Sequence, residues 1–291
     1  MINKIKTYLE LVKFSHTIFA IPFGLSAVFI IEKGFPSWEK IFWILVALVS
    51  ARTAGMAFNR FVDRPIDAKN PRTKNWPSAK GEVRPNEIMA LGLISSIIFI
   101  FSAYKLNMLA FWLSPMVILL LLLYPAGKRF TSYVHLILGL VYFLIPIAVS
   151  IALKGSIEIS TIFLGIAMAF WVAGFDILYA LQDYEFDKSF GLYSIPVKYG
   201  IKNAILISRT FHFITFICLI LTGVFADLSY VYFAGVFILS GFLVYEHLLI
   251  KEDDLSKINK AFFTVNGFIS IIFSIVVLLD VFIGGWKWKI Y

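Results

Sequence analysis

Long apolar runs separated by short polar segments dominate the hydrophobic pattern of this chain. A helix needs about 20 mostly apolar residues to cross the hydrocarbon core of a bilayer. Nine runs approach that length, and they cover residues 15–32, 41–60, 86–104, 107–124, 133–153, 158–181, 203–225, 229–250 and 261–283. Nothing with the alternating pattern of barrel strands competes with them. The pattern therefore predicts an all-α, polytopic membrane protein built as a bundle of nine transmembrane helices.

Ahead of the first run, Ile5, Leu9 and Val12 recur at helical spacing among lysine and glutamate residues. This spacing predicts a short amphipathic helix that lies on the membrane surface. We do not expect signal-peptide cleavage, because the charged segment is long and no small-residue site follows the apolar run. No Pro/Gly/Ser-rich linker or low-complexity tract divides the chain, so we predict one domain over residues 1–291.

The composition narrows the class of protein further. The chain is 60% hydrophobic and 15% charged, whereas soluble domains are about 25% charged. That much apolar surface excludes a soluble enzyme and a disordered chain. A single cysteine, Cys218, excludes a disulfide scaffold. In a membrane protein, the net charge of +8 indicates positive cytoplasmic loops and contact with anionic lipid or phosphate, not with nucleic acid.

Lysine and arginine residues fall mainly on one side of the predicted bundle. With the N-terminus in the cytoplasm, 18 of them lie in cytoplasmic segments and six lie outside. Seven of the 18 belong to the single segment 60–84. Cytoplasmic loops carry such an excess, so we expect an inner-membrane protein whose N-terminus and long polar loops face the cytoplasm. The ending Trp286-Lys287-Trp288-Lys289 suits the outer interface.

The first of two acidic clusters ends the second predicted span. Asn59, Asp63 and Asp67 follow one another at intervals of four, which places their side chains on one helix face. Arg52 lies on the same face, seven residues deeper. A charge inside a span costs several kcal/mol, so Arg52 is a candidate functional residue.

The second cluster ends the sixth predicted span. Asp176, Tyr179, Asp183 and Asp187 have offsets of 0, 3, 7 and 11, which again form one stripe. Carboxylates at helix ends are often only solvated, and that alternative applies to any single member. Two facing stripes, however, repel each other unless a cation lies between them. Carboxylate and amide oxygens suit Mg²⁺, whose other ligands are often phosphate oxygens.

Basic residues flank both clusters, and they complete the ingredients of a diphosphate site. The candidates for diphosphate binding are Arg64, Arg72, Lys128, Arg129 and Lys188. Lys13 and His16 face one way in the first span and are candidates for binding the carboxylate of a small substrate, together with Arg52 and His135. Arg209, His212, Glu246 and His247 are better explained as interhelical pairs.

These residues resemble the motifs of the UbiA superfamily of intramembrane prenyltransferases. Members carry Asn-x3-Asp-x3-Asp after the second span and Asp-x3-Asp after the sixth, with an upstream Asp-x-x-Tyr. The corresponding residues here are Asn59, Asp63 and Asp67, then Asp183 and Asp187, then Asp176 and Tyr179. Agreement extends to Asn70-Pro-Arg-Thr73, Tyr124-Pro125, Lys128-Arg129, Leu138-Gly139, Lys260-Ala-Phe-Phe263 and Asn266.

The resemblance has two departures. Trp76 stands in a loop where members often carry another arginine, so one phosphate contact falls to Lys74 or Lys80. His135 stands where the 4-hydroxybenzoate enzymes often have glutamine. With Lys13-Phe-Ser-His16, it resembles the branch that prenylates a dihydroxynaphthoate on the futalosine route to menaquinone. Both acceptors stay open at this point.

The resemblance implies transfer of a polyprenyl chain from its diphosphate to an aromatic acid acceptor in a cavity at the centre of the bundle. Mg²⁺ is the expected cofactor, with Asn59, Asp63, Asp67, Asp183 and Asp187 as ligands. Asp183 or Asp176 is the candidate base, beside Tyr179. Phe58 and Phe175 are candidates to stabilise the allylic cation. Membrane lipid is a further partner, and no obligate protein partner is implied.

Two rival classes fit less well. An ion-coupled transporter predicts ionisable residues near the midplane and broken helices in paired positions, whereas the acids here gather at the cytoplasmic ends. CDP-alcohol phosphotransferases need an Asp-Gly pair, and the sequence contains none.

Overall fold

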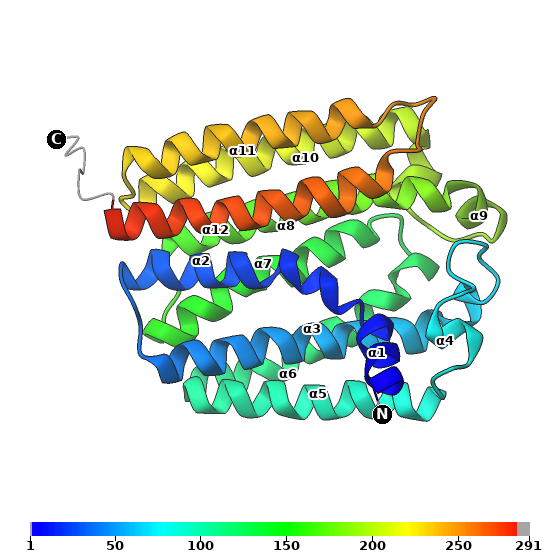
Figure 1. Ribbon diagram of the computed structural model, residues 1–291, viewed down its shortest axis with the longest axis horizontal. Coiled ribbons are helices and arrows are strands. Elements are labelled where there is room, and N and C mark those ends of the chain that lie inside the picture. The colour runs from blue at the N-terminus through cyan, green and yellow to red at the C-terminus, as the bar shows by residue number, and fades with distance from the viewer. Residues whose placement is uncertain (1, 284–291) are drawn as a thin grey trace.

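The long helices of the protein lie side by side and run between two ends of the molecule (Figure 1). The computed structural model describes residues 2–283, except the side chains of Ile2, Asn3, His16 and Ile18. Within that range, eight helical stretches are long and apolar enough to cross a membrane. The predicted all-α membrane bundle is confirmed. The residues expected at the outer interface, 286–289, lie outside the described residues.

The α-helices follow one another as α1 (Ile2–Leu11), α2 (Ile21–Glu32), α3 (Trp38–Asp67), α4 (Pro77–Lys80), α5 (Pro85–Leu106), α6 (Met108–Leu123), α7 (Val134–Lys154), α8 (Ile159–Ala180), α9 (Tyr184–Ser189), α10 (Ile195–Phe225), α11 (Tyr230–Leu249) and α12 (Asn266–Ile283). Three 3₁₀ segments are η1 (Phe14–Phe19), η2 (Tyr124–Arg129) and η3 (Leu181–Asp183). The segment η4 (Lys260–Val265) is a π-helix that leads directly into α12.

The first predicted span, residues 15–32, differs from expectation. It consists of the 3₁₀ segment η1 followed by α2, which has 12 residues and is therefore about 18 Å long. Pro22 at the start of α2 explains the break, because proline has no N–H to donate to the preceding turn. The remaining predicted spans correspond to helices, so the nine-span prediction becomes eight full-length helices and one interrupted segment.

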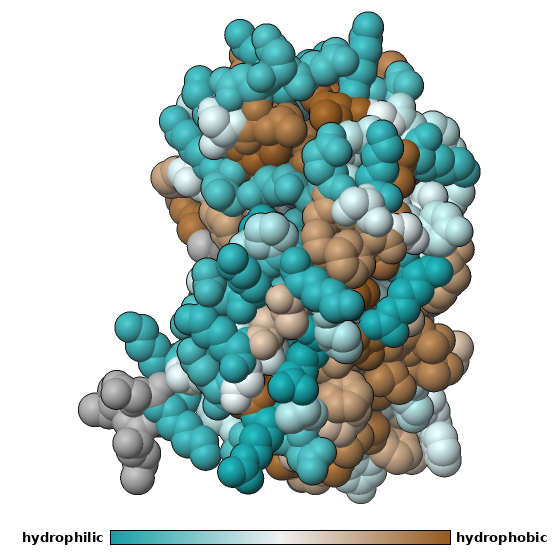
Figure 2. Space-filling model, turned by 90° about the vertical axis from the view of Figure 1, so that its right-hand side faces the viewer, coloured by the Kyte–Doolittle hydropathy of each residue, from teal (hydrophilic) through white to brown (hydrophobic). Residues whose placement is uncertain are grey.

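Two helices continue well beyond their apolar runs at the same end of the bundle. The helix α3 extends to Asp67, seven residues past the predicted limit, and so carries the whole first acidic cluster. The helix α10 begins at Ile195, with a break at Gly200, where φ is 78°. Hydrophilic residues cover this end (Figure 2). It is the end that carries α4 and α9.

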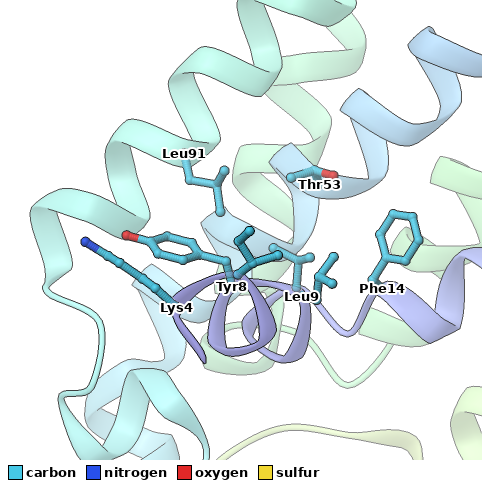
Figure 3. Close-up of a pocket in the computed structure, with 8 residues that line it drawn as sticks. Lys4, Tyr8, Leu9, Phe14, Thr53 and Leu91 are labelled. Atoms are coloured by element: carbon cyan, nitrogen blue, oxygen red, sulfur yellow. The ribbon is translucent and has the colours of Figure 1, made fainter. Parts of the chain in front are cut away.

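The predicted N-terminal helix is present as α1 and lies across α3 (Figure 1). Leu11 is buried, whereas Ile5 and Leu9 are half exposed. Beside them a surface pocket of about 460 Å³ is walled by α1, α3 and α5 (Figure 3). A position on the membrane surface stays a prediction for this helix. Val12, the third residue of the helical spacing, lies just beyond the end of α1 and is buried.

Buried polar residues join the helices of the second half of the bundle. Trp171 Nε1 donates to Asn266 Oδ1 at 2.7 Å, and Asn266 Nδ2 donates to Glu246 Oε1 at 2.6 Å. His212 lies 3.6 Å from Glu246 and 2.9 Å from His247. The interhelical pairing expected of His212, Glu246 and His247 is confirmed, and it ties α8, α10, α11 and α12 together, whereas Arg209 is exposed.

The helices α7 and α8 approach each other closely at Gly139. A Cβ atom at this position would lie 2.7 Å from the carbonyl oxygen of Ala169, a backbone atom of the neighbouring helix. Small residues allow such close packing between membrane helices. Gly139, part of the Leu138-Gly139 pair singled out in the sequence, therefore sets the distance between the two helices that carry His135 and Asp176.

We predict that Gly139→Ala destabilises the fold by about 1–3 kcal/mol, because the carbonyl of Ala169 cannot move without shifting its helix. Thermal unfolding in detergent measures this as a lower midpoint. Gly267→Ala is the matched control, since a Cβ there meets nothing within 4 Å. Alanine favours helix by up to about 1 kcal/mol over glycine, so the control midpoint stays or rises. Equal losses in both variants would contradict the close-packing argument.

Candidate active site

A central cavity of about 990 Å³ lies inside the bundle, and its wall is mostly apolar. It is bounded chiefly by α3, α6, α7 and α8, with η1 and η4 closing one side. Polar residues gather on the part of its wall near the hydrophilic end. They are Lys13, Arg52, Asn59, Arg60, Asp63, Asp67, Arg72, Trp76, Tyr124, Lys128, His135, Tyr142, Asp176, Tyr179, Gln182, Asp183 and Asn259.

The first acidic cluster lies on the cavity wall, as its spacing predicted. Asn59 Nδ2 donates to Asp63 Oδ2 at 2.9 Å. One oxygen of Asp67, Oδ2, is buried and has no hydrogen-bond partner, although Arg60 Nη1 lies 3.6 Å away. The cluster thus presents carboxylate and amide oxygens toward the cavity, one of them unsatisfied.

Asp183 of the second cluster is held on both oxygens. Its Oδ1 accepts from Asn70 Nδ2 at 2.9 Å and from Arg72 Nε at 2.8 Å, and its Oδ2 accepts from Arg72 Nη2 at 2.5 Å. Arg72 Nη1 donates to the hydroxyl of Tyr179 at 2.9 Å. Burial lowers the pKa of Arg72, but its hydrogen bond to Asp183 more than offsets this, and the pKa lies above its ordinary value. The guanidinium therefore stays charged.

Asp187 is buried and does not line the cavity. It forms an ion pair with Lys128, whose Nζ lies 3.4 Å from Asp187 Oδ2. Lys128 itself lines the cavity from η2. The pair joins η2 to α9 and fixes the position of a cationic side chain at the cavity wall.

A second polar group lies deeper in the bundle, about two helical turns from the acidic clusters. Arg52 lines the cavity from α3, and its Nε is buried without a hydrogen-bond partner. His135 of α7 and Asp176 of α8 also line the cavity, and His135 Nδ1 lies 2.7 Å from Asp176 Oδ2. The structure thus brings together three candidates from three different helices.

Aromatic rings also form part of the cavity wall. Tyr179 stacks on Phe262, with ring centroids 4.1 Å apart, and Phe175 packs edge-on against Phe262 at 5.2 Å. Phe175 lines the cavity as expected. Phe58 does not, because it points from the other side of α3 into a buried contact with Gly92 of α5. The assignment of Phe58 as a cavity-facing residue is wrong.

Three of the predicted diphosphate ligands do not line the cavity. Arg64 Nε donates to the carbonyl of Ser78 at 3.0 Å and so braces α4. Arg129 donates to the carbonyl of Val62 at 2.7 Å, with Asp63 Oδ1 3.9 Å away. Lys188 is exposed and lies 5.7 Å from the ring of Tyr184. The side chain of His16 lies outside the described residues.

Trp76 and Arg60 are cavity residues whose importance the sequence did not reveal. The guanidinium of Arg60 lies 3.8 Å from the ring centroid of Trp76, and Lys13 and Arg72 each lie 5.4 Å from it. Burial lowers the pKa of Lys13, and the charge of Arg60 lowers it further. Three cationic side chains thus lie around the ring of Trp76. Lys74 and Lys80, the expected substitutes for the missing arginine, do not line the cavity. A charge inside a span was the available signal for Arg60.

No set of three or more His, Cys, Asp or Glu residues is assembled to hold a metal ion within residues 2–283. The oxygens of Asn59, Asp63 and Asp67 nevertheless fit a hard divalent cation, because these residues line the cavity and Oδ2 of Asp67 has no hydrogen-bond partner. Asp183 and Asp187 pair more closely with Arg72 and Lys128, at 2.5 and 3.4 Å, than Asp67 and Asp63 pair with Arg60 and Arg129, at 3.6 and 3.9 Å. The first cluster is therefore the better metal ligand set of the two.

Comparison with known proteins decides the family. A profile of the UbiA prenyltransferase family matches residues 20–272. The chain belongs to this family. It is an integral membrane prenyltransferase, as the acidic motifs and the helical bundle together predicted.

Related proteins of the UbiA family cover almost the whole chain. The 4-hydroxybenzoate octaprenyltransferase of Shewanella sediminis is 30% identical over 91% of this chain and 93% of its own length. That of Vibrio parahaemolyticus is 27% identical over 95% and 98%. The apo structure of a UbiA homologue from Aeropyrum pernix K1 is 30% identical, with a TM-score of 0.82 over 91% of this chain and 98% of that one.

A more distant structure shares the fold. The UbiA homologue from Archaeoglobus fulgidus bound to GPP and Mg²⁺ is 20% identical, with a TM-score of 0.71 over 94% of this chain and 99% of that one. At 20% identity, the comparison shows that the two proteins share a fold.

We predict that Arg72→Ala destabilises the protein by about 3 kcal/mol, because it leaves the buried carboxylate of Asp183 without its cation. Adding Asp183→Asn removes the unpaired charge and recovers part of the loss. Unfolding in a denaturing detergent gives the free energy of unfolding of Arg72→Ala, of Asp183→Asn and of the double variant, which together form a double-mutant cycle. Simple addition of the two single losses would contradict a direct interaction.

Proposed function

We propose that the protein transfers a polyprenyl chain from polyprenyl diphosphate to an aromatic acid of the 4-hydroxybenzoate type, in ubiquinone biosynthesis. One observation carries the proposal: acids and cations share one end of a cavity whose remaining wall is apolar. A diphosphate and its hydrocarbon chain need that combination. The names of the Shewanella and Vibrio relatives support the choice of acceptor.

The diphosphate end of the substrate belongs at the acidic clusters. Mg²⁺ held by Asn59, Asp63 and Asp67 would neutralise the diphosphate and make it a better leaving group. Asp183 contributes by fixing Arg72, and Asp187 by fixing Lys128, so that both cations face the leaving group.

Loss of the diphosphate leaves an allylic cation, which needs protection from water. The rings of Phe175 and Tyr179 line the cavity, next to Asp176 and between Asp176 and Asp183 along the chain, respectively. Aromatic faces attract cations by about 0.5–2 kcal/mol each. The apolar wall excludes water, which would otherwise capture the cation. The acceptor ring then attacks the cation and forms the new C–C bond.

The acceptor carboxylate belongs at Arg52. This arginine lies on the cavity wall, and its Nε has no partner among the described residues. A bound carboxylate would supply that partner through a charge-assisted hydrogen bond. The distance of seven residues from Arg52 to Asn59 spans about 10 Å of helix, which leaves room for one aromatic ring between the carboxylate and the diphosphate. A 1,4-dihydroxy-6-naphthoate acceptor would use the same residues.

The polar end of the bundle belongs on the cytoplasmic side of the inner membrane. The lysine and arginine bias of 18 to six supports that orientation. It opens the diphosphate site and the loop 68–76 toward the cytoplasm.

The direct test is a product assay. Membranes that contain the protein receive polyprenyl diphosphate, Mg²⁺ and either 4-hydroxybenzoate or 1,4-dihydroxy-6-naphthoate, and mass spectrometry identifies the products. We expect prenylated 4-hydroxybenzoate, lost on addition of EDTA and reduced about 100-fold or more in Asp63→Ala. Asp253→Ala, an exposed loop variant, keeps full activity. No product with either acceptor would refute the aromatic acceptor, and product that survives EDTA would refute the role of the metal.

The acceptor site makes a separate prediction. Arg52→Gln raises the KM for the aromatic acid about 10- to 100-fold, because hydrogen bonds to charged groups contribute about 1.5–3 kcal/mol. The KM for polyprenyl diphosphate stays unchanged. Arg209→Gln is the matched control, since Arg209 is an exposed arginine of a spanning helix that does not line the cavity. A rise in the KM for polyprenyl diphosphate alone would show that Arg52 binds the diphosphate and not the aromatic acid.

A further inference from the structure

The contact between His135 and Asp176 lies at the level of the proposed acceptor site. Asp176 precedes Asp183 by seven residues, as Arg52 precedes Asn59, so Asp176 and Arg52 lie about 10 Å deeper than the two acidic clusters. The side chain of Asp176 is 22% exposed and lines the cavity. That of His135 is 1% exposed and also borders the cavity.

The surroundings of His135 indicate which nitrogen carries its proton. Its Nε2 is buried without a hydrogen-bond partner, whereas Nδ1 lies 2.7 Å from Asp176 Oδ2. A protonated Nε2 would be a buried donor with nothing to accept it, which is costly. The proton therefore belongs on Nδ1, which donates to Oδ2. This bond fixes the carboxylate and leaves Oδ1 available to the cavity.

The other carboxylates of the cavity are engaged. Three hydrogen bonds hold both oxygens of Asp183, from Asn70 and Arg72. Asp63 accepts from Asn59, and Asp67 lies beside Arg60. Within residues 2–283, Asp176 is the cavity carboxylate that pairs with a histidine and not with an arginine, a lysine or an asparagine.

We infer that Asp176 is the catalytic base of the transfer and that His135 is its positioning residue. The inference rests on the proposed function. The prenyl C–O bond breaks and its electron pair leaves with the diphosphate, and a ring carbon of the acceptor then bonds to the allylic carbon. The C–H bond at that ring carbon breaks, its electrons restore the aromatic ring, and Asp176 Oδ1 takes the proton. Asp183 instead anchors Arg72.

The test separates proton removal from ionisation of the diphosphate. Polyprenyl diphosphate with ¹⁸O in the bridging position reports reversible ionisation, because the label scrambles into non-bridging positions when the C–O bond breaks and re-forms. We expect Asp176→Asn to lower prenylation about 10²- to 10⁴-fold, the usual contribution of general acid–base catalysis, while ¹⁸O scrambling continues at the wild-type rate. Asp253→Asn, an exposed variant, changes neither rate.

His135 is tested by a pair of variants. His135→Leu removes the donor to Asp176 and lowers prenylation about 10- to 100-fold, the range found when partners that orient metal-bound groups are removed. It also creates a primary isotope effect with a ring-deuterated acceptor, since proton removal becomes slow. His135→Gln keeps an N–H donor and restores most of the activity. A purely structural role would lower scrambling and prenylation together and would leave the isotope effect unchanged.

Three results would overturn the inference. Full prenylation by Asp176→Asn excludes Asp176 as the base. Loss of scrambling together with prenylation in that variant places Asp176 in ionisation. If Asp183→Asn loses prenylation but keeps scrambling, while Asp176→Asn stays active, the base is Asp183. A wild-type protein that gives neither scrambling nor product fails at the proposed function itself, which distinguishes that failure from a wrong base.

Discussion

The ion pair between Arg72 and Asp183 connects residues 111 positions apart at the mouth of the cavity. Each charge alone would be costly where water is scarce, so the loop after α3 and the end of α8 are stable there only together. Arg72 also holds the hydroxyl of Tyr179, whose ring stacks on Phe262. One contact thus links α3, α8 and the π-helical turn before α12, and with them both walls of the diphosphate site.

The sequence predicted the features that depend on local pattern. Hydropathy locates the long helices, because each must cover a fixed thickness of hydrocarbon. Helical spacing places Asn59, Asp63 and Asp67 on one face, and the structure keeps them there. The sequence predicted side-chain contacts less well where the possible partners of a side chain lie far apart in the sequence. Arg64 turns to the carbonyl of Ser78, and Phe58 turns to Gly92. The break of the first span at Pro22 was missed, although proline carries the signal.

The cavity has two polar levels and an aromatic zone on its wall. The outer level holds acids matched with Arg72 and Lys128, and the inner level holds Arg52 and the pair of Asp176 and His135. The proposed reaction requires such a division, because the diphosphate and the acceptor are polar whereas the prenyl cation that passes between them is apolar. The buried network of Trp171, Asn266 and Glu246 stands behind this zone and holds α8 against α12. The polar residues of the cavity are therefore separate from the buried polar network that packs the helices.

The wall of the cavity includes Met116, Leu119 and Leu140, which are also exposed on the outer surface of α6 and α7. The cavity thus opens sideways, toward the place where lipid would lie. A hydrocarbon tail that leaves through this opening moves from one apolar medium into another, so each added isoprene unit changes the binding free energy little. The cavity then does not determine the length of the prenyl chain. Under the proposed function, the length of the side chain on the product is decided earlier, by whichever reaction builds the diphosphate.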